Sequence, residues 1–201
     1  TINQNKTIIQ AGANFNANKS LISYSPTNNN QILDSIIITN LQFLGENRAK
    51  NAININQSNS WIQEKSIIEI SNNYIEDTRG YPISIKGIET EKRGSKYPNV
   101  KILHNQITKG YSGELSSDSY QRSLVNIENI SNLLIENNLL SVSSINSTYV
   151  NDANFINIVR SNYSTNLGLS ISAESKYTTD QTIIRGNILA SNQKIQNGIK
   201  Y

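Results

Sequence analysis

A short pattern of apolar and polar positions recurs along the chain. The copies are IIEISNNYI (67–75), VKILHNQI (100–107), LLIENNLL (133–140), TIIRGNIL (182–189) and IIITNLQF (36–43). In each copy two inward residues, mostly aliphatic, alternate with an outward one, which is the period of a β-strand with one buried face. The copies therefore predict strands that share a single apolar core.

The spacing of the copies is typical of a solenoid. Ile38, Ile70, Ile102 and Ile135 are about 32 residues apart, and about 49 residues lead on to Ile184. A strand with two inward side chains cannot bury them alone, whereas copies stacked about 4.8 Å apart form one continuous core. The pattern predicts one all-β domain over residues 1–201. It would have about six rungs, each rung being one turn of the solenoid, with an insertion in the long interval.

A sharp bend is expected after each strand, where four copies carry an asparagine and the fifth carries Leu41. Asparagine is the residue that best tolerates left-handed backbone angles after glycine. Stacked asparagine side chains can also pass amide hydrogen bonds between rungs. We therefore predict an asparagine ladder, with Leu41 at its edge, that contains Asn73, Asn105, Asn138 and Asn187.

Two further residues, Gly12 and His104, are expected to lie at bends of this kind. KTIIQAGANF (6–15) parallels TIIRGNIL and is expected to place Gly12 at its bend. His104 is the only histidine, and it occupies a slot that holds asparagine in other copies. We expect it to form hydrogen bonds in the stack rather than to act as a general base.

A second set of strands, which we call the companion strands, follows the copies. NAININ (51–56) and YPISIKG (81–87) are examples. Their outward positions form a row of small polar side chains: Asn54, Ser84, Asn126 and Asn157. The turns that enter these strands, with the residues close to them, contribute Arg48, Arg79, Arg122, Asp77, Asp118 and Tyr120. Polar side chains in these positions either face water only or form the lining of a groove.

The repeated pattern, with companion pairs such as YPISIKG, resembles the right-handed parallel β-helix of pectate-lyase-like proteins. That group includes polysaccharide lyases, hydrolases, epimerases and phage tail spikes, and the resemblance covers nearly the whole chain. It implies that the companion strands bind sugar. Amides and hydroxyls would then bond sugar hydroxyls, and arginine would hold a sugar carboxylate. The substrate-binding candidates are Asn54, Ser84, Asn126, Asn157, Arg48, Asp77 and Asp118.

Catalysis is the alternative interpretation. An uronate lyase of this kind would need an Arg, Lys or Tyr base and carboxylate neutralisation, often by calcium on Asp or Glu oxygens. The catalytic candidates are Arg79, Arg122 and Tyr120. The specific motifs of pectate lyases, polygalacturonases and mannuronan epimerases are not found in the sequence, which favours binding over catalysis.

Composition excludes several other classes of function. The net charge is +3 without a basic cluster interleaved with aromatics, which argues against nucleic acid. No apolar run approaches the length of a membrane span, and cysteine is absent, so disulfides and thiol chemistry are excluded.

Two functions follow as expectations. The first is an extracellular, cell-surface or virion-surface β-helix, of tail-spike or adhesin type, that binds polysaccharide without a metal or cofactor. The alternative is a polysaccharide lyase or related carbohydrate-active enzyme that acts on an acidic glycan, with calcium as the cofactor that such a lyase would use. No stretch of the sequence resembles a terminal cap. We therefore expect a segment of a longer solenoid, or a solenoid capped by a homo-oligomer or by flanking domains.

Overall fold

The computed structural model describes residues 6–26, 32–56, 61–87, 99–111, 123–128, 130, 132–144, 154–159, 182–191 and 197–200. Their secondary structure is all β, in three sheets whose strands pair in parallel. No helix among these residues has the length and apolar character needed to cross a membrane. The architecture is that of a parallel β-helix solenoid.

Sheet A contains β1 (Thr7–Gln10), β4 (Leu41–Leu44), β7 (Tyr74–Glu76), β10 (Gln106–Tyr111), β13 (Leu139–Ser144) and β16 (Ile188–Ser191). Sheet B contains β2 (Ile22–Tyr24), β5 (Ile53–Asn56), β8 (Ile83–Lys86), β11 (Ser123–Glu128), β14 (Asn154–Val159) and β17 (Asn197–Lys200). Sheet C contains β3 (Ile32–Thr39), β6 (Trp61–Ser71), β9 (Asn99–Leu103), β12 (Asn132–Glu136) and β15 (Thr182–Arg185).

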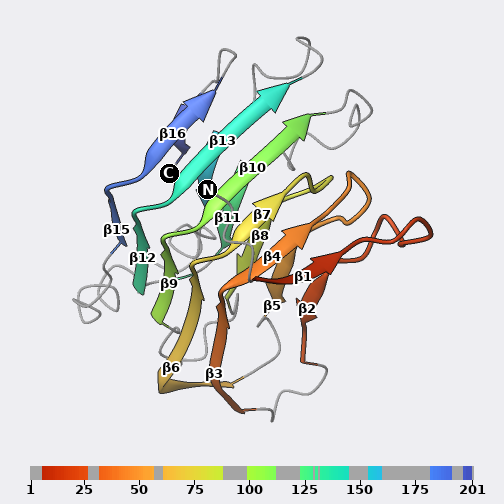
Figure 1. Ribbon diagram of the computed structural model, residues 1–201. Coiled ribbons are helices and arrows are strands. Elements are labelled where there is room, and N and C mark those ends of the chain that lie inside the picture. The colour runs from red at the N-terminus through yellow and green to blue at the C-terminus, as the bar shows by residue number, and fades with distance from the viewer. Residues whose placement is uncertain are drawn as a thin grey trace, which may run out of the picture.

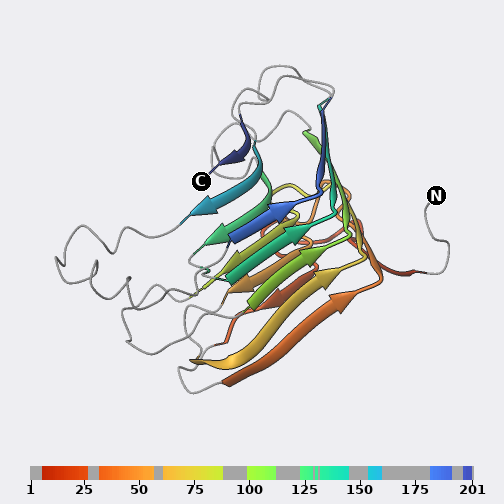
Figure 2. The same ribbon diagram turned by 90° about the vertical axis from the view of Figure 1, so that its left-hand side faces the viewer.

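From β3 onward the chain visits sheets C, A and B in turn, so each circuit adds one strand to every sheet. Figure 1 shows the strands of sheet A side by side, from β1 in red to β16 in blue, and the strands of sheet C meeting them at a bend. Figure 2 shows the strands of sheet C in the same order from β3 in orange. The predicted copies are the strand pairs that flank this bend, and the companion strands form sheet B.

The core consists of inward columns that run from strand to strand. Ile70 pairs with Ile102, and Ile102 pairs with Ile135, in the register of sheet C. All three side chains have no exposed surface. The prediction that these isoleucines stack in a single core is therefore confirmed, and similar columns in sheets A and B close the same core.

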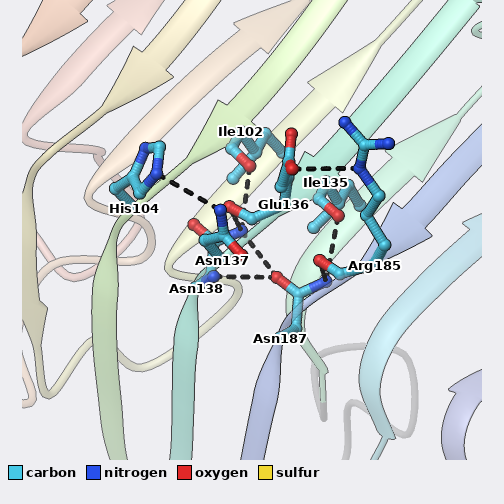
Figure 3. A network of polar contacts seen from close by, with 8 residues as sticks. All are labelled: Ile102, His104, Ile135, Glu136, Asn137, Asn138, Arg185 and Asn187. Atoms are coloured by element: carbon cyan, nitrogen blue, oxygen red, sulfur yellow. Dashed lines mark hydrogen bonds and ion pairs between the residues drawn. The ribbon is translucent and has the colours of Figure 1, made fainter.

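The bend asparagines form a chain of hydrogen bonds between successive circuits. The Asn73 amide donates to Asn105 Oδ1 at 3.1 Å, and the Asn105 amide donates to Asn138 Oδ1 at 3.0 Å. The Asn138 amide continues to Asn187 Oδ1 at 2.9 Å (Figure 3). At the other end Leu41 contributes its backbone N–H, which donates to Asn73 Oδ1 at 2.9 Å.

Each of these amides also satisfies a carbonyl of the preceding circuit. The Asn105 amide reaches Ile70 O at 2.8 Å, and the Asn138 amide reaches Ile102 O at 2.8 Å. Asn73, Asn105 and Asn138 are almost completely buried. Without these amides the carbonyl groups at the bend would be left buried and unpaired, which costs free energy.

The backbone of the bend differs from the sequence-based expectation. The left-handed residue is the one before each ladder asparagine, as φ shows for Asn72 (55°), His104 (55°), Asn137 (55°) and Gly186 (63°). The prediction that Asn73 and its equivalents adopt this conformation is wrong. The preceding residue turns the chain and points to solvent, which leaves the next side chain directed inward.

His104 takes the place of asparagine at this outer corner. It is exposed, and the Asn137 amide lies 3.4 Å from His104 Nε2 (Figure 3). The expected hydrogen-bonding role in the stack is confirmed by this contact.

The first strand is a second departure from expectation. β1 pairs with β4 in sheet A, with Ile9 beside Phe43, and does not occupy the position of TIIRGNIL in sheet C. Ile8 is consequently 56% exposed. TIIQ and TIIR have the same apolar pattern, so the pattern alone could not distinguish the two sheets.

Candidate functional site

The outer face of sheet B carries the predicted polar row in register. Asn54 pairs with Ser84, Ser84 pairs with Asn126, and Asn126 pairs with Asn157. Ser23 extends the row at the β2 end. The alternation along β5 and β8 sends isoleucines inward and these polar side chains outward, which explains the row physically.

This row lies in a groove with a volume of about 700 Å³. The residues that line it are Asn18, Lys19, Ser20, Ser23, Lys50, Asn51, Asn54, Tyr81, Ser84, Asn126, Glu128 and Asn157. Apart from the Tyr81 ring, the side chains are amides, hydroxyls and charged groups. Such a surface can exchange hydrogen bonds with a hydroxylated ligand.

One end of the groove holds a continuous chain of polar contacts. The Asn157 amide donates to Asn126 Oδ1 at 2.7 Å, and the Asn126 amide donates to Glu128 Oε1 at 3.0 Å. Glu128 Oε2 lies 3.6 Å from Lys86 Nζ. Asn126 is only 2% exposed, so its side chain is held in place by these neighbours.

The other end is formed where the chain enters β2 and β5. The backbone N–H of Lys50 donates to Lys19 O at 2.8 Å, which places these two residues in adjacent circuits. The Asn51 amide donates to Ser20 Oγ at 3.2 Å. Asn51 Oδ1 is buried and has no hydrogen-bond partner among the described residues. An unpaired buried acceptor is rare and calls for a donor.

Several predicted residues do not line this groove. Arg48 is exposed and donates to Ala11 O at 3.5 Å. The backbone of Arg79 donates to Ala49 O at 2.9 Å, and Asp77 sits in the same turn with φ of 50°. The structure therefore brings together Asn54, Ser84, Asn126 and Asn157, whereas Arg48, Arg79 and Asp77 belong to the turns from sheet A to sheet B. Asp118, Tyr120 and Arg122 lie outside the described residues, so their predicted roles stay predictions.

The same turns enclose a buried lysine. Lys109 has no exposed surface, and its Nζ donates to Arg79 O at 3.1 Å and also to Gly80 O. Burial lowers the pKa of Lys109 to about 7, and the charge of Asp77 opposes that shift. Since Lys109 is enclosed, this amine ties β10 to the preceding turn.

Sequence reasoning missed Glu128, Asn51 and the lysine pair of the groove. Glu128 stands two positions after Asn126 on the same outward face, so strand alternation could have found it. Lys19 and Lys50 lie before their strands, where no periodic pattern extends. Asn51 begins NAININ in the register of the inward residues Ile53 and Ile55, so alternation gave no reason to assign it to the groove. In the described part of the chain no three His, Cys, Asp or Glu side chains form a cluster that could hold a metal ion.

Comparison with family models, with curated proteins and with solved structures finds no match for this chain.

Proposed function

We propose that this chain is a right-handed parallel β-helix of about six rungs, related to the pectate-lyase-like proteins, and that it binds polysaccharide at an extracellular, cell or virion surface. The site is the groove on the outer face of sheet B. The bend asparagines act as its asparagine ladder and keep successive circuits in register. The observation that carries the proposal is the polar row, in which four predicted outward residues line one groove in adjacent strands.

The geometry of the row suits a polymeric ligand. Neighbouring strands lie about 4.8 Å apart, so four strands present polar groups along roughly 15 Å. A sugar ring carries hydroxyls that both donate and accept, and the amides and hydroxyls of the row do the same. Tyr81 adds an aromatic ring, which can pack against the apolar face of a sugar.

A steric block tests this site directly. Ser84 lies at the middle of the row, so Ser84→Trp would fill the groove without touching the core. We expect this variant to lose polysaccharide binding in affinity electrophoresis. Thr108→Trp, on the outer face of sheet A, is the matched control and should bind like the parent. Equal binding by the two variants would place the site elsewhere, and release of oligosaccharides by the parent would show catalysis.

A further inference from the structure

Four of the asparagines that line the groove direct their amide nitrogens toward other protein groups. The acceptors are Ser20 Oγ for Asn51, Ser23 Oγ for Asn54, Glu128 Oε1 for Asn126 and Asn126 Oδ1 for Asn157. Each of these NH₂ groups therefore has one of its two N–H bonds engaged within the protein. The carbonyl oxygens are less engaged, because among these four residues only Asn126 Oδ1 accepts a hydrogen bond from another described residue.

Glu128 fixes the donor-to-acceptor direction of these hydrogen bonds at one end of the groove. An ionised carboxylate only accepts hydrogen bonds, so the group of Asn126 that faces it must be the NH₂ group. The Asn126 oxygen then faces Asn157. The Asn157 group that contacts it must therefore be the NH₂ group, which donates the hydrogen bond. The carbonyl oxygen of Asn157 is left without a partner among the described residues. Lys86, beside Glu128, compensates the negative charge that anchors this chain.

Asn51 provides a second acceptor of the same kind. Its Oδ1 is buried without a partner in the described part of the chain, although the residue lines the groove. A ligand hydroxyl that displaces the groups covering this oxygen would donate to it, whereas a carboxylate or sulfate could not. Asn51 lies just before β5 and Asn157 lies on β14, three strands away, so the two acceptor sites are separated by roughly 15 Å across the sheet. A single glycan segment can reach both.

We infer that the groove selects a neutral, hydroxyl-rich glycan over an anionic one, and that Glu128 sets this selection by orienting the amides of Asn126 and Asn157. This inference rests on the proposed polysaccharide binding. Lys19 and Lys50 also line the groove, and they would attract an anion. Lys19 is exposed and Lys50 is partly exposed, so water and salt screen their charges. The acceptors of the floor are not screened in this way.

The test compares the two ligand classes directly. Binding of the parent protein is measured by titration calorimetry against neutral laminarin, mannan and amylose and against anionic polygalacturonate, alginate and chondroitin sulfate, at low and high sodium chloride. We expect binding to a neutral glycan with little dependence on salt. Preferential binding to an anionic glycan that weakens with salt would overturn the inference and leave polysaccharide binding intact. Binding to neither class would overturn both.

Two variants test the mechanism of selection. Glu128→Gln replaces a carboxylate, which can only accept hydrogen bonds, with an amide that can also donate. The Asn126 and Asn157 side chains can then flip and present their NH₂ groups to the ligand. We expect neutral-glycan affinity to fall about 3- to 10-fold and relative affinity for anionic glycans to rise. Asn51→Leu removes the unpaired acceptor and should lower affinity by a similar factor without lowering the melting temperature. Glu69→Gln, on the outer face of sheet C, is the control. Parent-like affinity and ligand preference in both groove variants would refute the assigned roles.

Discussion

Asn105 and Asn138 stand 33 positions apart in the sequence, yet the amide of Asn105 lies 3.0 Å from Asn138 Oδ1. The backbone N–H of Asn105 donates to the same oxygen at 2.9 Å. One side chain thus fixes the height and the register of two adjacent circuits. The groove on sheet B depends on that register, because a shift by one residue would exchange its polar row with the core.

Removing one member of this chain should destabilise the solenoid. Asn105→Ala takes partners from Ile70 O and from the neighbouring asparagines, so we expect a loss of about 1–3 kcal/mol in the free energy of unfolding. Chemical denaturation measures the loss. Gln106→Ala, at the next and exposed position, should change stability by less than about 0.5 kcal/mol. Equal effects from the two variants would mean that the chain of amides contributes nothing specific.

The two residues of the bend should respond differently to glycine. Asn72 has a φ of 55° and is exposed, so Asn72→Gly should be tolerated within about 0.5 kcal/mol. Asn73→Gly removes a buried amide that bonds Ile38 O and should cost about 1–3 kcal/mol. Thermal melting of both variants checks the assignment. A larger loss of stability in Asn72→Gly than in Asn73→Gly would mean that Asn73 is the residue in the left-handed conformation.

The core column gives a third prediction. Ile102 has no exposed surface and stacks between Ile70 and Ile135, so Ile102→Ala should cost about 2–5 kcal/mol through the cavity that it leaves. Lys101→Ala changes the adjacent outward position on β9 and serves as the control, with an expected change under about 0.5 kcal/mol. A small loss for Ile102→Ala would contradict a continuous core.

Lys109 makes stability depend on pH. Its pKa is lowered from 10.5 to about 7 in the folded protein, so at intermediate pH the unfolded chain binds more protons. The free energy of unfolding should therefore rise as pH increases from about 7 to about 10.5. Urea denaturation across this range measures the slope, and Lys109→Met should flatten it. A slope that persists unchanged in Lys109→Met would assign it to other groups.

The sequence contained enough information for the strands and the core, because apolar alternation reports directly which side chains face inward. It also placed Asn54, Ser84, Asn126 and Asn157 on one face. It did not reveal Lys109, an inward position two residues after Ile107, since a charged side chain there interrupts the apolar pattern. The groove ends formed by Lys19, Lys50 and Asn51 lie in turns, where position depends on packing between circuits rather than on periodicity.

Side-chain amide NMR gives the most direct test of the central claim that sheet B binds polysaccharide. Asn126 and Asn157 carry NH₂ groups in the groove, and Gln42 and Gln106 carry them on the outer face of sheet A, so each face reports its own contacts. On titration with the tightest-binding neutral glycan, the NH₂ resonances of Asn126 and Asn157 should shift while those of Gln42 and Gln106 stay fixed. Shifts confined to Gln42 and Gln106 would contradict the account.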